Sequence, residues 1–170
     1  MDKTAEFCGI EIKEDNVETL EQIKIDEGGY QAEVYKCTAG KLTWLIGRNI
    51  EDRPITNHEW ESLSISLGGG YSQEDWADFL FAQEIESITK SFMTCGVHLS
   101  GYPRCVTNII LNMGYNIGIT KFNPTMWPNF FKAIKERNWK QAAIEGRDSL
   151  WFTQVGQRSV RLMKSLENVK

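Results

Sequence analysis

The sequence predicts a mainly helical α+β protein, and three observations point to that class. Apolar residues recur at helical spacing in several segments, the longest of which covers residues 73–94. One short stretch, residues 33–47, alternates as a β-hairpin around a glycine-containing turn. The length of 170 residues suits a single domain over residues 1–170, or two lobes that share one core.

The first helix is predicted over residues 16–27. Val17, Leu20 and Ile23 mark one of its faces, and the Gly28-Gly29 pair stops it. Residues 1–14 before it form an extension to which the sequence assigns no structure.

Two further helices open at capping-box spacing, in which a hydroxyl residue is followed three positions later by a carboxylate. Residues 56–59 open a short helix that runs to about Ile65, and glycines 68–70 end it. Residues 72–75 open the longest helix.

Apolar stripes on the two longest helical segments are expected to form the core, because such stripes are far more often packed inside than bound to a cofactor. They are Trp76, Leu80, Phe81, Ile85, Ile88 and Phe92 in the first, and Val106, Ile109, Ile110 and Met113 in the second.

The composition is that of a soluble globular protein, with 41% hydrophobic and 25% charged residues. The N-terminus has neither the basic nor the apolar region of a signal peptide, and no run of about 18 apolar residues occurs. We therefore expect synthesis in the cytoplasm and no stable membrane insertion.

Charge is distributed unevenly along the chain. The net charge is −4, yet residues 131–170 contain nine Lys and Arg against four Asp and Glu. A polyanionic surface would be met by this C-terminal part. The acidic total argues against affinity driven by bulk charge, and we expect no nucleic-acid partner.

The four cysteines form no CxxC pair, and there are only two histidines, so no metal site is expected. Cys8, Cys95 and Cys105 are predicted to be reduced, small, buried side chains, although Cys95 and Cys105 could meet across a short loop. Cys37 differs, because it lies in the predicted hairpin with two other reactive residues.

Three chemically able side chains lie within 17 positions of one another: Glu27, Cys37 and Thr43. Asp26-Glu27-Gly28 after an apolar helix, followed by a hairpin that carries Thr43 and closes on Ile46-Gly47, resembles the start of the phage-type lysozymes (endolysins), the T4-lysozyme-like family. Glu27 matches the family's catalytic glutamate and Thr43 its threonine. Cys37 stands where the family has aspartate, and its spacing from Glu27 is about one residue longer.

A second resemblance to the same family covers the C-terminal part. Asn116-Ile117-Gly118 is similar to the family's polar-apolar-Gly signature. The family's spacing is also kept by Trp139, Ala142-Ala143, Trp151, Gln154, Arg158 and Arg161. Together the matches span residues 20–165.

The resemblance implies a lysozyme-like two-lobed fold. A small N-terminal lobe with the hairpin would cover about residues 15–72, and a long helix over about residues 73–94 would connect it to a helical C-terminal lobe over about residues 95–170. In the family, the glycan lies in the groove between the lobes.

The resemblance also implies a muramidase, which hydrolyses the β-1,4 bond between N-acetylmuramic acid and N-acetylglucosamine in peptidoglycan without a cofactor. Glu27 would be the general acid, while Cys37 and Thr43 would position or activate water. Cys37 could act as a base, act as a nucleophile or only pack, so an inverting or a retaining outcome stays open.

Three further side chains acquire roles from the same resemblance. Asn116 and Gln154 are expected to bind the glycan. Arg158 is expected to reach the carboxylate of Glu27, because a buried carboxylate needs a partner.

The resemblance gives a biological setting as well. We expect a monomeric endolysin in the host cytoplasm that reaches the peptidoglycan glycan strands when a holin opens the membrane at lysis. Two alternatives remain open: a cysteine-dependent amidase or peptidase that pairs Cys37 with His58 or His98, and a non-catalytic wall-binding homologue.

Overall fold

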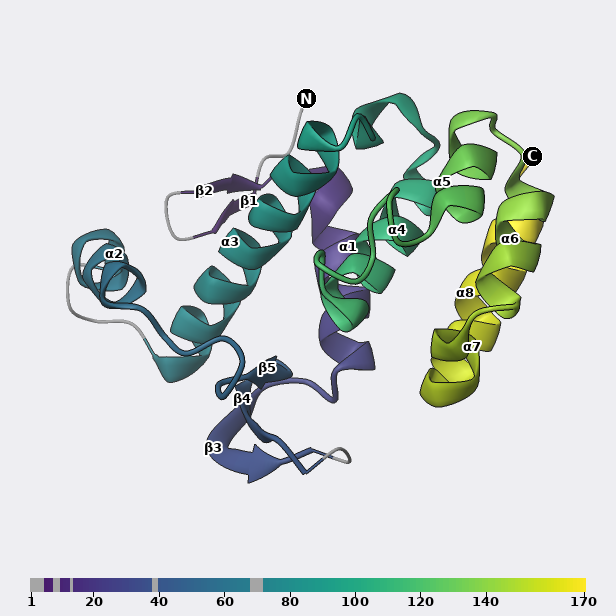
Figure 1. Ribbon diagram of the computed structural model, residues 1–170. Helices are drawn as coiled ribbons and strands as arrows, with labels where there is room; N and C mark the ends of the chain where they lie inside the picture. The colour runs from purple at the N-terminus through teal and green to yellow at the C-terminus, as the bar shows by residue number, and fades with distance from the viewer. Residues whose placement is uncertain (1–4, 8–9, 13, 38–39, 68–71) are drawn as a thin grey trace. The chain divides into compact units, whose positions relative to one another are not determined.

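The computed structural model describes residues 5–7, 10–12, 14–37, 40–67 and 72–170 (Figure 1). Cys8, the hairpin turn at residues 38–39 and glycines 68–70 lie outside the described residues. The chain divides into two compact units, an N-terminal unit of residues 1–84 and a C-terminal unit of residues 85–170. The boundary falls inside the longest helix, α3 (Gln73–Thr94).

The N-terminal unit combines two small antiparallel sheets with helices. In chain order it contains β1 (Ala5–Phe7), β2 (Ile10–Ile12), α1 (Glu14–Asp26), β3 (Gln31–Lys36), β4 (Leu42–Leu45), β5 (Arg48–Asn49), α2 (Asn57–Leu67) and the first half of α3. β1 pairs with β2, and β3, β4 and β5 form a three-stranded sheet in that order. The β1–β2 hairpin lies in the extension to which the sequence assigned no structure.

The C-terminal unit is helical. After the second half of α3 come a 3-10 helix (Leu99–Gly101), α4 (Arg104–Ile117), α5 (Pro128–Lys135), α6 (Trp139–Arg147), α7 (Leu150–Val155) and α8 (Gln157–Glu167). The predicted mainly helical α+β class is confirmed. Within the described part of the chain, no helix is long and apolar enough to cross a membrane.

The predicted capping boxes both open helices. Thr56 Oγ1 accepts from the backbone N–H of Glu59, and Glu59 Oε2 accepts in return from the N–H of Thr56. Ser72 and Asp75 make the same reciprocal pair at the start of α3. Each box supplies partners to N–H groups that the first turn of a helix leaves without an internal acceptor.

The apolar stripes form the core as predicted. Each of the ten residues expected inside is at most 5% exposed. Tight packing between helices relies on a small residue in the C-terminal unit: a β-carbon at Gly146 of α6 would lie 2.1 Å from the sulfur of Met163 on α8. Glycine at this position therefore lets the two helices approach closely.

The predicted burial of two cysteines is wrong. Cys95 and Cys105 are both exposed, and neither is in a disulfide. Cys95 lies just beyond the end of α3, and Cys105 lies in the first turn of α4. Helix ends face solvent more often than helix centres do, which outweighs the general preference of cysteine for the interior.

Three tryptophans pack together in the N-terminal unit. Trp76 of α3 stacks on Trp60 of α2 with ring centroids 4.5 Å apart, and it meets Trp44 of β4 edge-on at 5.6 Å. The indole N–H of Trp44 donates to the carbonyl of Ala32 on β3. This cluster joins the three-stranded sheet to both helices, and offset and edge-on ring pairs of this kind add to the free energy of area burial.

A buried arginine fixes the edge strand of that sheet. Arg48, 8% exposed, donates from two guanidinium nitrogens to the Glu59 carboxylate at 2.8 and 3.0 Å. Its remaining hydrogen bonds go to the carbonyls of Arg53 and Pro54. Arg48 therefore ties β5 to the first turn of α2 and to the loop before it.

The hydrogen bonds between Arg48 and Glu59 make the stability of the fold depend on pH. Burial raises the pKa of Glu59, but the hydrogen bonds from Arg48 and Thr56 and the charge of Arg48 outweigh burial, so that the pKa lies below its ordinary 4.5. At a pH between the pKa of Glu59 in the folded protein and its ordinary value of 4.5, the unfolded chain binds more protons than the folded one. The stability from this group is therefore present above about pH 4.5 and is lost as the pH falls through the folded value.

We predict that Glu59→Gln lowers the free energy of unfolding by about 2–4 kcal/mol at pH 7, because it leaves the Arg48 charge buried without a carboxylate. Urea unfolding should show the difference from wild type shrinking between pH 6 and pH 3. The control Glu61→Gln, exposed on the same helix, should change stability by less than about 0.5 kcal/mol. A constant difference over that pH range would contradict the assignment.

Candidate active site

Glu27 follows the last residue of α1 and is half-buried. Its backbone N–H still donates to the carbonyl of Ile23, and the next two residues, Gly28 and Gly29, have positive φ angles that end the helix. The side chain of Glu27 packs against Gly47, in the turn between β4 and β5. The helix end and the three-stranded sheet therefore meet at the predicted general acid.

The strand that leads from Glu27 to Cys37 is irregular. Gln31 pairs with Leu45 and Tyr35 pairs with Thr43, so the register of β3 against β4 shifts between Gln31 and Tyr35. Such an irregularity admits extra residues in one strand while the pairing continues beyond it. The additional residues of β3 lie between Glu27 and Cys37, and the strand pairing continues beyond them to Lys36 and Leu42.

Cys37 and Thr43 are brought together by one backbone carbonyl. The N–H of Cys37 donates to the oxygen of Lys41 at 3.0 Å, and the Thr43 hydroxyl donates to the same oxygen at 3.1 Å. Thr43 is 3% exposed, whereas Cys37 is partly exposed and is not in a disulfide. The backbone of Cys37 and the hydroxyl of Thr43 therefore share one acceptor in the hairpin, and the catalytic roles of both residues stay a prediction.

Tyr35 connects the helix end with the hairpin turn electrostatically. Burial raises the pKa of its phenol, and the negative charges of Glu27 and Cys37 raise it further. Tyr35 is also the cross-strand partner of Thr43. Tyr35 therefore pairs with Thr43 and interacts electrostatically with Glu27 and Cys37, and its raised pKa keeps the phenol neutral at pH 7.

Lys41, whose carbonyl accepts from Cys37 and Thr43, directs its ammonium group to two carboxylates. The ammonium group of Lys41 lies 3.2 Å from Glu51 and 3.8 Å from Asp52. The hydrogen bond to Glu51, followed by the charges of both carboxylates, raises the pKa of Lys41. Lys41 is therefore oriented towards the loop after β5.

The predicted glycan-binding residues of the C-terminal unit differ in their surroundings. Asn116 is exposed near the end of α4, and its Oδ1 accepts from the indole N–H of Trp151 at 2.8 Å. This hydrogen bond fixes the carboxamide and directs its NH2 group away from the indole. Gln154 is exposed on α7.

Arg158 of α8 is held by a buried asparagine. Its Nε donates to Oδ1 of Asn112 at 2.8 Å, and Asn112 is 2% exposed. Asn112 lies on α4, four residues before Asn116 and therefore on the same side of the helix. The pairing of Arg158 with Glu27 that the resemblance implies stays a prediction.

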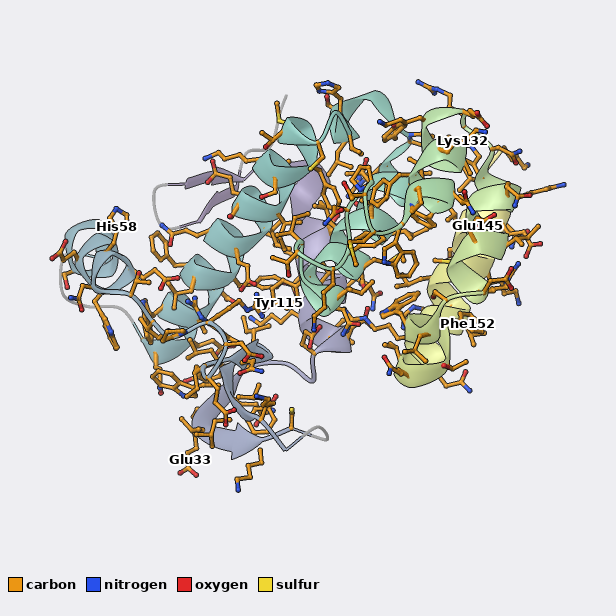
Figure 2. All side chains as sticks on the ribbon, viewed as in Figure 1. Glu33, His58, Tyr115, Lys132, Glu145 and Phe152 are labelled. Atoms are coloured by element: carbon orange, nitrogen blue, oxygen red, sulfur yellow. The ribbon has the colours of Figure 1, made fainter. Side chains whose placement is uncertain are left out.

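The two histidines of the alternative thiol chemistry are both exposed. His58 lies on α2 and projects outward there (Figure 2). His98 precedes the 3-10 helix of the C-terminal unit. Among the described residues, no group of three or more His, Cys, Asp or Glu side chains could hold a metal ion.

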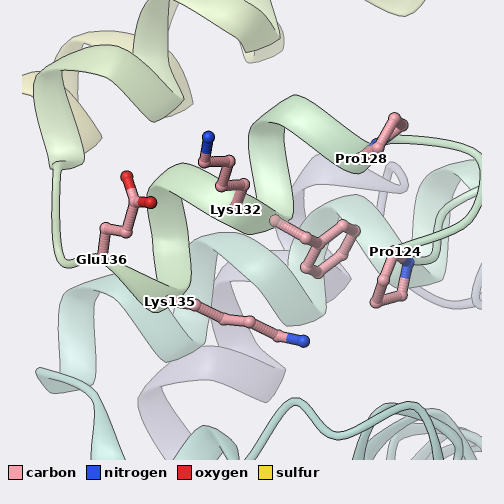
Figure 3. Close-up of a pocket in the computed structure, with 6 residues that line it drawn as sticks. Pro124, Pro128, Lys132, Lys135 and Glu136 are labelled. Atoms are coloured by element: carbon pink, nitrogen blue, oxygen red, sulfur yellow. The ribbon is translucent and has the colours of Figure 1, made fainter.

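A hollow of about 360 Å³ lies on the C-terminal unit, and Figure 3 shows the side chains that line it. Its lining consists of Pro124, Pro128, Phe131, Lys132, Lys135 and Glu136. Phe131 is 1% exposed and belongs to the core. The hollow is an open depression beside α5 that includes none of Asn116, Gln154 and Arg158.

Sequence reasoning did not identify three residues that shape the site: Tyr35, Gly47 and Asn112. The cross-strand position of Tyr35 depends on a register shift that the sequence does not reveal. Asn112 lies four residues before Asn116, and helical spacing of the two amides is the signal that could have indicated it.

A helix-end glutamate, a small antiparallel sheet that carries Thr43 and a helical C-terminal unit define a lysozyme-like protein. No protein-family model matches the chain. "Probable T4-type lysozyme 2" of Dictyostelium discoideum is 27% identical over 163 residues, which cover 86% of this chain and 92% of the relative. "Probable T4-type lysozyme 1" of the same organism is 28% identical over 160 residues, with the same coverage. The predicted resemblance to the T4-lysozyme-like family and the lysozyme-like fold class are therefore confirmed.

We predict that Arg158→Leu lowers the free energy of unfolding by on the order of 3–5 kcal/mol, as expected if Arg158 pairs with Glu27, as the resemblance implies, in addition to Asn112. In a Glu27→Gln background the loss should fall to about 1–3 kcal/mol, the cost of leaving Asn112 without its donor. Urea unfolding of the four proteins measures both values.

Arg161→Leu is the control for this experiment, because Arg161 is exposed on the same helix. It should cost less than about 0.5 kcal/mol. Equal losses for Arg158→Leu in both backgrounds would show that Arg158 acts through Asn112 alone.

Proposed function

We propose that the protein is a muramidase, a glycoside hydrolase that cleaves the β-1,4 bond between N-acetylmuramic acid and N-acetylglucosamine in peptidoglycan. The observation that carries the proposal is the hairpin in which the Cys37 backbone and the Thr43 hydroxyl share the Lys41 carbonyl, with Tyr35 as the cross-strand partner of Thr43. The similarity to two proteins named as T4-type lysozymes supports the same class of reaction.

In the proposed reaction Glu27 donates its proton to the glycosidic oxygen as the bond to the anomeric carbon breaks. The positive charge that develops on the sugar is then quenched by water. The Thr43 hydroxyl donates a hydrogen bond to the carbonyl of Lys41, so its oxygen is left to accept a hydrogen bond from that water. As a thiolate, Cys37 takes up the proton that the attacking water loses; in the other route the thiolate attacks the anomeric carbon, and water then cleaves the sugar–sulfur bond.

Asn116 and Gln154 are proposed to bind the glycan, since both carry exposed carboxamides. The Asn116 carboxamide is already oriented by Trp151, which lowers the entropy cost of binding a sugar. Arg158 is proposed to balance the charge of Glu27. The reaction requires no cofactor in this scheme.

We propose further that the protein is an endolysin. It would act as a monomer, remain in the host cytoplasm and reach peptidoglycan when a holin opens the membrane. Both relatives come from an amoeba, so this setting rests on the resemblance of the catalytic hairpin to phage-type lysozymes rather than on the relatives' source.

The test of Glu27 is the clearing of outer-membrane-permeabilised cells. Glu27→Gln keeps the shape of the side chain but removes the transferable proton, so we expect turbidity loss to slow at least about 100-fold. Glu33→Gln, an exposed neighbour on β3 (Figure 2), is the matched control and should clear at the wild-type rate. Equal clearing by wild type and Glu27→Gln would remove Glu27 from the mechanism.

We predict that Cys37→Ala lowers activity by about 10²–10⁴-fold, the contribution of a positioned base. Cys37→Asp should keep much of the activity, because it supplies the carboxylate that the family has at this position. Release of reducing sugar from purified peptidoglycan is the measurement.

Cys95→Ala, which removes an exposed thiol of the C-terminal unit, is the control and should behave as wild type. Full activity of Cys37→Ala would mean that the thiol only packs, and that Glu27 works with Thr43 and water.

The same assay separates the alternatives by their products. A muramidase releases reducing sugar, whereas a cysteine-dependent amidase or peptidase that uses Cys37 releases free amino groups. A non-catalytic wall-binding homologue would sediment with peptidoglycan and release neither.

A further inference from the structure

The turn between β4 and β5 presents bare backbone to the side chain of Glu27. A β-carbon at Gly47 would lie 2.6 Å from Oε2 of Glu27, 3.0 Å from its Cβ and 3.1 Å from its Cδ. Ordinary contacts with a β-carbon are at 3.4–4 Å. Any side chain at position 47 would therefore displace the carboxylate by most of an ångström, or displace the turn.

Backbone conformation alone does not explain the glycine. Gly47 has φ +66°, which L-residues rarely adopt, but Leu45 in the same turn has φ +57° and carries a full side chain. Leu45 is 2% exposed, so packing stabilises its strained backbone. The reason for glycine at position 47 is therefore steric: the Glu27 carboxylate occupies the space that a β-carbon would fill.

The turn is fixed on both sides of Gly47. Ile46 before it is 1% exposed, and Arg48 after it makes the buried hydrogen bonds to Glu59, Arg53 and Pro54. Glu27 is the half-buried partner at the end of its helix. In a collision between a new side chain at position 47 and the carboxylate, the carboxylate would move.

We propose that Gly47 is a positioning residue for Glu27. Because glycine has no β-carbon, the Glu27 carboxylate can lie directly against the turn, and the hydrogen bonds of Arg48 fix the turn in that position. This inference rests on the proposed function of Glu27 as the general acid. A proton donor must lie within hydrogen-bond reach of the leaving oxygen, and a misplacement of about 1 Å can cost about 100-fold in rate.

The first measurement compares Gly47→Ala with Gly96→Ala on soluble peptidoglycan fragments. Gly96 lies beyond the end of α3 with φ +72°, and among the described residues a β-carbon there would meet just the Lys135 ammonium at 4.0 Å. Both variants carry the same backbone strain, so the pair isolates the contact with Glu27. We expect kcat to fall about 100-fold for Gly47→Ala with KM nearly unchanged, and both constants to stay within about twofold of wild type for Gly96→Ala.

The second measurement is independent of activity. Thermal unfolding of wild type, Gly47→Ala, Glu27→Ala and the double variant forms a double-mutant cycle. Glu27→Ala removes the Oε2 and Cδ atoms that a β-carbon at position 47 would strike. Gly47→Ala should therefore lower Tm more than Gly96→Ala does in wild type, and the excess should shrink in the Glu27→Ala background, where only the 3.0 Å contact with the Glu27 Cβ remains.

The outcomes separate this inference from the proposed function. If Gly47→Ala fails to fold but folds in the Glu27→Ala background, the contact is supported. Additive Tm changes, or equal kcat values for Gly47→Ala and Gly96→Ala while Glu27→Gln is inactive, would overturn the inference and leave the role of Glu27 intact. Full activity of Glu27→Gln would instead overturn the proposed function, and the Tm cycle would still report whether Gly47 holds the carboxylate in place.

Discussion

The geometry of the candidate site depends on the buried guanidinium of Arg48. The three strands of its sheet contain six, four and two residues, and a sheet this small needs packing or side-chain partners from outside to be stable. Arg48 supplies four such hydrogen bonds, two to Glu59 and two to backbone carbonyls. Glu59, which belongs to the capping box of α2, also forms the ion pair with Arg48. Because Arg48 follows Gly47 directly, this ion pair sets the position of the turn against Glu27.

Local signals were enough to predict most of the helices. Thr56 with Glu59 and Ser72 with Asp75 each satisfy N–H groups of a first helical turn, and this requirement is independent of the rest of the fold. The β1–β2 hairpin was not predicted, because its two strands of three residues are too short for alternation to be distinguished from chance. The exposure of Cys95 and Cys105 could not be predicted either, since residue type alone does not show which face of a helix end meets solvent.

In the candidate site, the sequence did not predict the residues whose importance depends on tertiary contacts. Resemblance pointed to Glu27, Cys37 and Thr43 because each stands at a fixed place in a motif. Tyr35 and Gly47 were missed because their importance arises from proximity: Tyr35 lies opposite Thr43 only after the register of β3 has shifted, and Gly47 meets Glu27 across a turn. Neither contact is visible in the spacing of residues along the chain.

In the hairpin, the position of the Cys37 backbone does not depend on the chemical nature of its side chain. Its backbone N–H is held by the Lys41 carbonyl, which also holds the Thr43 hydroxyl, and neither hydrogen bond depends on the side chain at position 37. The backbone hydrogen bond at position 37 is therefore open equally to a thiol residue and to the aspartate that the resemblance implies there.

The chemical difference between the two groups is nevertheless large. A carboxylate is ionised at neutral pH, whereas an unperturbed thiol is mostly protonated. Because only a small fraction of an unperturbed thiol is ionised at neutral pH, the proposed reaction depends more strongly on proton donation by Glu27. Catalysis then depends on the position of the Glu27 carboxylate. In this chain that position is determined by Gly47, which leaves space for the carboxylate, and by Arg48, which fixes the turn.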